Sequence, residues 1–223
     1  MTELRFSVLG VAPEAYAASP VLTVRLRIVE LSAAVVHAIA LRVQVRIEPQ
    51  RRAYTDVEER GLLDLFGHRD RWSNTLRPFT WTHCTALVPG FAGETEVDLP
   101  LPCTYDFEVS ASKYLDALTD GQIPIELLFS GTVFTRGETG FGGKGFGDRG
   151  FQVEQVSWAA AASHQLPVAT WRAVMDEHFP NSAWIRVGRE SFTALKEFKA
   201  EHGLLHWDDA LELLLARAST GAP

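Results

Sequence analysis

The stretch LRVQVRIE, Leu41 to Glu48, alternates apolar and polar side chains along its whole length. In an extended chain the apolar members fall on one face and the polar members on the other. The apolar face carries Leu41, Val43, Val45 and Ile47, and the polar face carries Arg42, Gln44, Arg46 and Glu48. Such alternation is typical of antiparallel sheets that bury one face and expose the other to water. The stretch therefore predicts a strand of an antiparallel sheet.

The same alternation recurs through the first two thirds of the chain. It is found in LRFSVL (4–9), VLTVRLRI (21–28), ETEVDL (94–99) and YDFEVS (105–110). The more apolar IPIELLFSGTVF (123–134) is expected to form a central strand or two short ones. Alternating strands joined by Pro- and Gly-rich connections predict a mainly β, α+β protein built on an antiparallel β-sandwich.

Helical patterns interrupt and follow the strands. We expect helical excursions at 55–66, with Thr55 or Asp56 as the N-cap, and at 110–121. After Trp158 three segments carry apolar residues at helical spacing: 166–180, 189–203 and 206–218. The sequence predicts a β-sandwich domain over 1–158 and a C-terminal helical segment over 159–223 packed on it. A groove for a partner is the alternative use of these apolar stripes.

Composition disfavours two classes of partner, although a local basic patch could override the overall charge. The chain has 223 residues, a formal net charge of −7 and an ordinary apolar content of 46%. Nucleic acids and anionic membranes are bound through an excess of Lys and Arg, so neither is expected as a partner. No signal peptide is recognisable, and the apolar run 31–41 is too short to span a membrane. We expect a cytoplasmic protein in which Cys84 and Cys103 are reduced and buried, a disulfide being the alternative.

The glycine-rich segment GETGFGGKGFGDRG (137–150) contains the G-x-G-x-x-G spacing twice. A dinucleotide site needs a helix after this motif, yet GFQVEQVSW alternates like a strand. A P-loop fails because Gly145 follows Lys144, and a kinase loop fails because the HRD triplet at 68–70 precedes the glycines. We expect a hairpin connection that holds no phosphate. Its Phe141 and Phe146 are candidates for docking to a partner, with plain solvent exposure as the alternative.

No catalytic or metal-binding constellation is recognisable. His202 and His206 are separated by Gly203 at an expected helix break, and His83 and Cys84 are neighbours in an expected strand, pointing to opposite faces. No G-x-S-x-G elbow or Cys–His pairing is present. We therefore predict no cofactor, no metal and no catalytic residue.

One basic concentration remains, formed by Arg42, Arg46, Arg51 and Arg52. Together these arginines could bind an acidic partner or a phosphate. The alternative is a solvated face whose charge is balanced by Glu48, Glu58 and Glu59.

Several runs carry a resemblance to a known family: HAIALRVQVRIEPQRRAY, PCTYDFEVSASKYLDAL, PIELLFSGTVF and FPNSAW. They resemble an uncharacterised, mostly actinobacterial family whose genes lie near those of NiFe uptake hydrogenases. The resemblance implies an accessory or assembly role, with a hydrogenase or its maturation machinery as the partner. The chain departs from the family pattern at the glycine-rich segment, so a shared function is not expected to depend on that insertion.

The leading hypothesis is a non-enzymatic, cytoplasmic protein that acts through protein–protein interaction. A second is a ligand-binding or enzymatic sandwich whose site residues are scattered along the chain, and a third is a structural component of a larger assembly. A deep polar pocket lined by His83, His37 or Arg46 would favour the second hypothesis. A flat surface with an exposed apolar patch would favour the first.

Overall fold

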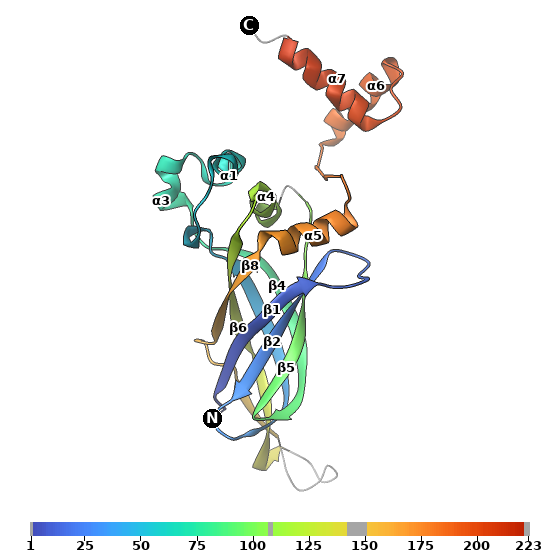
Figure 1. The fold of residues 1–223 in the computed structure, drawn as a ribbon. Coiled ribbons are helices and arrows are strands. Elements are labelled where there is room, and N and C mark those ends of the chain that lie inside the picture. The colour runs from blue at the N-terminus through green and yellow to red at the C-terminus, as the bar shows by residue number, and fades with distance from the viewer. Residues whose placement is uncertain (1, 107–108, 142–150, 221–223) are drawn as a thin grey trace. The chain divides into compact units, whose positions relative to one another are not determined.

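The structure is a computed structural model that describes residues 2–106, 109–141 and 151–220 (Figure 1). It divides into two compact units, residues 1–184 and 185–223. The first unit contains two antiparallel β-sheets with helices attached, and the second contains two helices. The predicted mainly β, α+β class is confirmed.

The first sheet, called sheet A, has the strand order β1-β2-β5. Its strands are β1 (Leu4–Pro13), β2 (Val21–Glu30) and β5 (Glu94–Pro102), and every pairing is antiparallel. Its central strand β2 buries alternate side chains, as the period-two pattern predicts.

The second sheet, called sheet B, has the order β4-β3-β6-β7, and β8 also pairs with β6. Its strands are β3 (Val35–Ile47), β4 (Phe79–Ala92), β6 (Gln122–Phe141), β7 (Phe151–Gln155) and β8 (Ala161–Pro167). The stretch 41–48 lies in the central strand β3 and just after it, with Leu41, Val43, Val45 and Ile47 buried and Arg42 exposed. The segment 123–134 is part of one long strand, β6, rather than two short ones.

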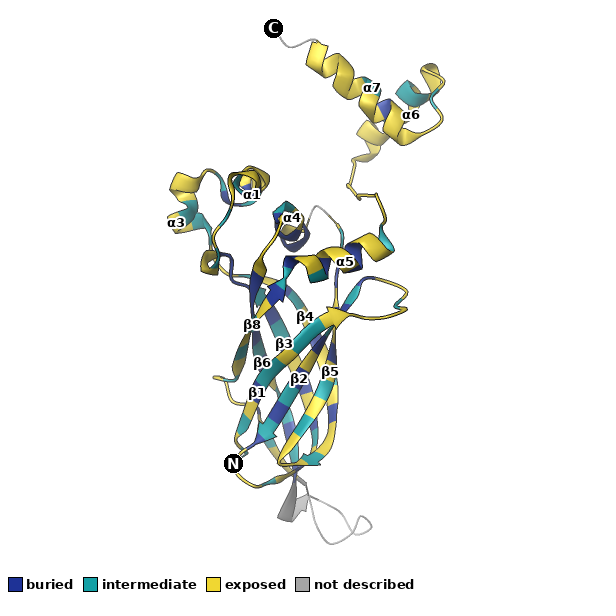
Figure 2. Cartoon of the chain, in the orientation of Figure 1, coloured by how far each residue is buried: buried dark blue, intermediate teal, exposed yellow. Residues whose placement is uncertain are grey.

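The core lies between the two sheets, where both present buried aliphatic side chains (Figure 2). Phe6 of sheet A stacks on Phe129 of sheet B with ring centroids 4.2 Å apart. Cys84 and Cys103 are free and buried, in agreement with the sequence. Burial raises the pKa of the Cys84 thiol to about 11 and that of Cys103 to about 12. Both thiols are therefore protonated at neutral pH and poor nucleophiles.

Helices lie at one end of the sandwich (Figure 1). They are α1 (Asp56–Gly61), α2 (Leu63–Phe66), α3 (Trp72–Thr75), α4 (Ser110–Ala117) and α5 (Val168–His178), with 3₁₀ turns at Pro49–Arg51 and Arg69–Arg71. Thr55 is the N-cap of α1, and a capping box joins it reciprocally to Glu58. The predicted helical excursion at 55–66 is thereby confirmed. The short turn or helix expected at 110–121 is the helix α4, which ends at Ala117 with Leu118 as its C-cap and is not closed by Gly121.

One expected strand is not found among the described residues, and one strand was not expected. The alternating run 105–110 forms no strand among its described residues, because β5 ends at Pro102 and a turn bond from Val109 N to Asp106 O leads into α4. Conversely, residues 161–167 form strand β8, although their sequence lacks a strong apolar alternation. Pairing with β6 supplies the backbone hydrogen bonds that define this strand.

Residues 159–184 belong to the first unit, because β8 pairs with β6 and α5 contacts β1, β2 and β8. The compact units divide after Trp184, later in the chain than the boundary expected after Trp158. The second unit consists of α6 (Arg189–Glu201) and α7 (Trp207–Thr220). Packing of residues 185–223 on the sandwich stays a prediction. None of the described helices is both long and apolar enough to cross a bilayer.

The glycine-rich segment joins two paired strands. β6 ends at Phe141, β7 begins at Phe151, and the two strands are antiparallel. Strand, and no helix, follows the double glycine motif, which removes the structural context of a dinucleotide site. Residues 142–150, with Phe146 among them, lie outside the described residues.

His178 at the end of α5 provides a pH-dependent contact with the β1–β2 loop. Its Nδ1 lies 2.9 Å from Val174 O and its Nε2 lies 3.1 Å from Ala17 O. Only the protonated ring can donate both hydrogen bonds, so these bonds raise the pKa of His178 above 6.5. The stabilisation is complete below the unfolded-state pKa and is lost as the pH rises through the raised folded-state pKa.

Nuclear magnetic resonance titration of the histidine rings measures this difference. We expect His178 to titrate above its ordinary pKa of 6.5, and the half-buried His164 to titrate below 6.5 because burial lowers its pKa. His164 is the internal control, since it is a histidine of the same unit. A His178 pKa equal to or below that of His164 would contradict the double hydrogen bond.

Candidate functional site

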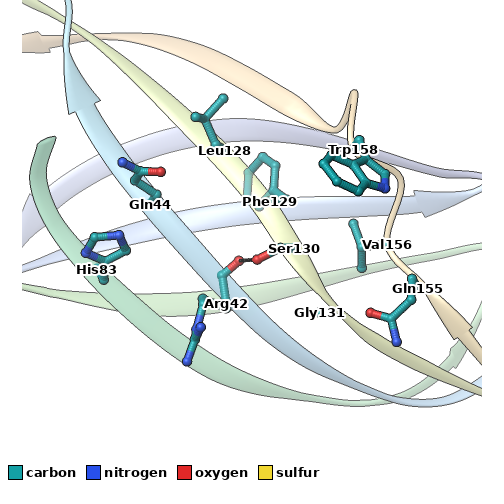
Figure 3. Close-up of a pocket in the computed structure, with 10 residues that line it drawn as sticks. All are labelled: Arg42, Gln44, His83, Leu128, Phe129, Ser130, Gly131, Gln155, Val156 and Trp158. Carbon is teal, nitrogen blue, oxygen red and sulfur yellow. Dashed lines mark hydrogen bonds between the residues drawn. The ribbon is translucent and has the colours of Figure 1, made fainter. Parts of the chain in front are cut away.

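The outward face of sheet B carries an open pocket of about 500 Å³, here called the sheet-B pocket (Figure 3). Ten residues line it: Arg42, Gln44, His83, Leu128, Phe129, Ser130, Gly131, Gln155, Val156 and Trp158. They come from β3, β4, β6, β7 and the turn that precedes β8. The sheet-B pocket is thus assembled from segments far apart in the sequence.

Strand register places the polar residues of the pocket in two rows. Gln44 of β3 is paired with His83 of β4 on one side and with Leu128 of β6 on the other. Arg42, two residues before Gln44, is paired with Ser130. Residues two apart on a strand share a face, so these rows lie side by side on the outer surface.

The pocket lies at the edge of sheet B where the partner of β6 changes from β7 to β8. β7 pairs with β6 at Thr132–Arg136 and β8 pairs with it at Gln122–Leu128, which leaves a gap between the two. The turn 156–160 bridges this gap through hydrogen bonds from Val156 N to Gly131 O (2.9 Å) and from Phe129 N to Ala160 O (3.0 Å). The bridging turn holds Trp158 at the rim of the sheet-B pocket (Figure 3).

Trp158 is the most exposed large apolar side chain of the described residues, with a relative exposure of 101%. Arg42 is also exposed, and no ion pair joins it to a described residue. An exposed indole and an exposed guanidinium thus line one pocket from either side of β6 (Figure 3), and Trp and Arg are among the side chains that contribute most to protein interfaces. The flanking Gln44, His83 and Gln155 add hydrogen-bonding groups around them.

The four arginines predicted to act together are separated by the structure. Arg42 alone lines the pocket, whereas Arg46 forms ion pairs with Glu48 (3.0 Å) and Glu126 (2.7 Å), and Arg51 with Glu48 (3.3 Å). The alternative interpretation, charge balance by nearby glutamates, describes Arg46 and Arg51. A partner-binding role for Arg42 stays a prediction, as does that of Phe141 at the end of β6.

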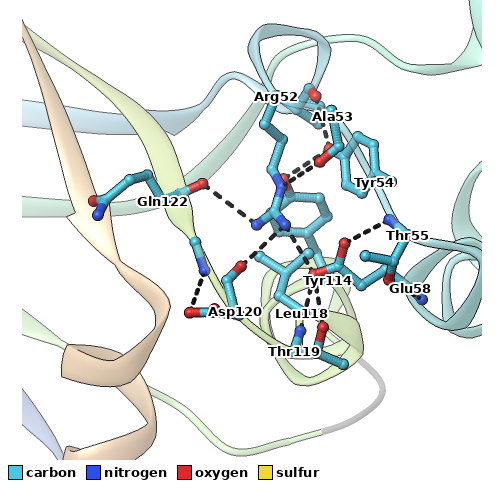
Figure 4. Close-up of polar contacts among 12 residues, drawn as sticks. Arg52, Ala53, Tyr54, Thr55, Glu58, Tyr114, Leu118, Thr119, Asp120 and Gln122 are labelled. Carbon is cyan, nitrogen blue, oxygen red and sulfur yellow. Dashed lines mark hydrogen bonds and ion pairs between the residues drawn. The ribbon is translucent and has the colours of Figure 1, made fainter.

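Arg52 has a structural role in a buried network at the helical end (Figure 4). Its guanidinium lies 2.8 Å from Glu58 and donates to the carbonyls of Asp120 (3.2 Å) and Gln122 (3.3 Å). Burial alone would raise the pKa of Glu58, but the N–H groups of Thr55 and Thr119 and the Arg52 charge lower it below its ordinary value. The network thus holds an ionised, fully hydrogen-bonded carboxylate.

Tyrosines complete this network. Tyr54 donates to Pro49 O (2.6 Å), its hydroxyl lies 2.9 Å from that of Tyr114, and Arg52 lies 5.0 Å from its ring centroid. Burial raises the pKa of Tyr54 above its ordinary value and that of Tyr114 to about 12, so both hydroxyls are neutral donors. These groups are satisfied by one another.

Within the described parts of the chain, no group of three or more His, Cys, Asp or Glu residues is arranged to hold a metal. His83 is exposed and Cys84 is buried, so they point to opposite faces as predicted. His37 and Arg46, expected as possible pocket residues, do not line the sheet-B pocket.

Sequence reasoning missed Trp158 and Gln155. Trp158 lies in a short Ser- and Ala-flanked turn between two strands, where it follows no periodic pattern. A large aromatic residue in a turn is the one local signal that could have identified it, because turns seldom bury such side chains.

The fold and pocket define a class: an antiparallel β-sandwich with an open pocket on one sheet and an appended helical unit. The chain belongs to a family of unknown function, DUF6084, which matches residues 1–223. A comparison with curated proteins finds no match. Among solved structures, the chain is similar to a β-glucosidase from Kluyveromyces marxianus, with 9% sequence identity and a TM-score of 0.25. That similarity covers 74% of this chain but only 15% of the β-glucosidase, and it is too low to bear on fold or activity.

Proposed function

We propose that this protein is a non-enzymatic interaction protein that binds an acidic segment of a partner protein at the sheet-B pocket. The observation that carries the proposal is that the fully exposed Trp158 and the exposed Arg42 line the same open pocket on sheet B. An indole left in water is unfavourable, and covering it with a partner removes apolar surface from water. Arg42 and the amide side chains then favour a partner that presents carboxylates.

The sheet suits such binding because its backbone is already ordered. Arg42 and Gln44 are held by the central strand β3, and the turn that carries Trp158 is joined to β6 by hydrogen bonds on both sides. Binding on an ordered surface costs less conformational entropy than binding on a mobile loop. The open shape of the pocket favours a protein segment over an enclosed small molecule.

The partner we propose is a hydrogenase or a component of its maturation machinery. This proposal depends on the resemblance to a mostly actinobacterial family encoded near NiFe uptake hydrogenase genes. We propose the cytoplasm as the compartment in which the protein acts. In that setting the protein would act as an accessory or assembly factor. Co-purification from the native host under conditions that preserve the hydrogenase tests the partner, and recovery of no stable partner would count against the proposal.

Substitutions in the sheet-B pocket test the surface. We expect Trp158→Ala and Arg42→Glu each to weaken partner binding at least about tenfold, since central Trp and Arg residues dominate interface energetics. Tyr16→Ala is a matched control, because Tyr16 is 100% exposed on the β1–β2 loop. Arg5→Glu is the control for charge, because Arg5 is exposed on the other sheet.

Binding of the captured partner to each purified variant is measured by biolayer interferometry. The dissociation constants of both control variants should lie within about twofold of that of the unmodified protein. This is far less than a tenfold change, which corresponds to about 1.4 kcal/mol of binding free energy. Equal losses in the pocket and control variants would assign binding to a different surface.

The pocket volume also supports a second candidate, a ligand-binding sandwich. About 500 Å³ lies in the range of small-molecule sites, and Arg42, His83 and Gln155 could orient a small carboxylate. A panel of small carboxylates tested by thermal shift separates the two functions. Saturable stabilisation that Arg42→Glu abolishes would favour the ligand-binding function.

A further inference from the structure

The second unit exposes apolar side chains that a folded helical pair normally buries. Among its described residues only Ala210 is fully buried. Large apolar residues remain at least one third exposed: Ile185, Val187, Phe192, Leu205, Trp207, Leu211, Leu214 and Leu215. Two short helices with so small a core are marginal in water without a covering surface.

α7 is apolar on two different faces. One face contacts α6: Ala210 is buried there, and Arg217 lies 5.3 Å from the Phe198 ring centroid and 2.9 Å from His202 Nε2. The other face is the stripe formed by Trp207, Leu211, Leu214 and Ala218, here called the α7 seam. At 3.6 residues per turn the two faces lie about a quarter turn apart.

The α7 seam has the spacing of a helix that pairs with another helix. Its members follow one another at intervals of four, three and four residues, the repeat of positions a and d in a coiled coil. All four are exposed, with Trp207, Leu211 and Leu214 exposed by 40%, 38% and 36%. α6 contacts the start of the seam, where the Phe192 and Trp207 ring centroids are 5.4 Å apart.

We propose that the α7 seam pairs antiparallel with the α7 seam of a second copy of this chain. In that two-fold arrangement each seam residue meets a complementary one: Leu211 lies opposite Leu214, and the large Trp207 lies opposite the small Ala218. The α6 helices then lie on the same side of the α7 pair, because each sits a quarter turn from its seam. The result is a four-helix bundle made of two helical hairpins.

Charge opposes a second copy only weakly at this unit. Residues 185–223 hold five of the 21 Lys and Arg residues and six of the 28 Asp and Glu residues, a net charge of −1 out of −7. Two such units that meet therefore repel each other little. Each dimer would present two sheet-B pockets, although the inference does not depend on what those pockets bind.

Sedimentation velocity of the full chain over a range of concentrations tests the pairing. We expect a species of twice the chain mass, and we expect Leu211→Glu/Leu214→Glu to raise the dissociation constant more than about a hundredfold, because four buried leucines become charged. Leu205→Glu is the matched control and should remain a dimer, since Leu205 is 82% exposed and lies outside the seam. A chain that stays monomeric at its highest soluble concentration overturns the proposal.

Crosslinking tests the register without relying on a disruptive variant. Leu211→Cys/Leu214→Cys should form disulfides between two chains upon mild oxidation, while the native Cys84 and Cys103 are buried. A covalent dimer on a denaturing gel, with a peptide map that joins position 211 of one chain to position 214 of the other, supports the antiparallel register. Absence of that dimer overturns the register, and so does a map that joins like positions of the two chains.

Discussion

Replacing Arg52 with methionine should lower the free energy of unfolding by about 3–5 kcal/mol, because it leaves the buried Glu58 carboxylate without its cation. The side chains of Arg52 and Glu58 are only 10% and 2% exposed, and their closest atoms are 2.8 Å apart. Glu58 also accepts hydrogen bonds from Thr55 N (3.0 Å) and Thr119 N (2.9 Å), which keep it in place when Arg52 is removed. The Glu58 carboxylate then remains buried without a cation beside it.

Urea denaturation followed by circular dichroism measures this loss. Arg51→Met is the matched control: the neighbouring arginine is 51% exposed and also pairs with a glutamate, and its loss should cost less than about 1 kcal/mol. The double variant Arg52→Met/Glu58→Met should be more stable than Arg52→Met alone, since it removes the isolated charge. A single variant within about 1 kcal/mol of the unmodified protein would contradict a stabilising role for this ion pair.

Replacing Gly131 with alanine should destabilise the sandwich by at least about 3 kcal/mol or prevent its folding. Gly131 has a φ of +143°, and a Cβ there would lie 2.1 Å from the carbonyl oxygen of Ala40 on the neighbouring strand β3. Neither the added Cβ nor the Ala40 carbonyl can move aside, because β3 and β6 are the two central strands of sheet B. The same close approach positions Ser130 and the floor of the sheet-B pocket.

Gly10→Ala is the control for this substitution. Gly10 lies in the edge strand β1, and a Cβ there would meet nothing within 4 Å. Its replacement should change stability by less than about 1 kcal/mol. Thermal and urea unfolding of both variants provide the comparison, and a Gly131→Ala protein as stable as Gly10→Ala would show that β3 and β6 can separate locally.

Local patterns predicted most of the elements because their causes are local. The alternation of residues 41–48 predicts which side chains of β3 are buried, and the N-cap expected at Thr55 or Asp56 predicts the start of α1. The run 105–110 was wrongly predicted to be a strand and strand β8 was not predicted, for one physical reason. A strand exists only where a neighbour accepts its hydrogen bonds, and such pairing depends on distant residues.

Composition and periodicity are properties of neighbouring residues, so the sequence alone determined that this is a mainly β protein with a helical C-terminus and an acidic net charge. They also showed that the glycine-rich segment leads into a strand and cannot open a helix. The grouping of Arg42, His83 and Trp158, and the diversion of Arg52 into a buried ion pair, came only from folding. The residues of each group are not linked by any local sequence pattern, and only the pairing of strands and packing of helices bring them together.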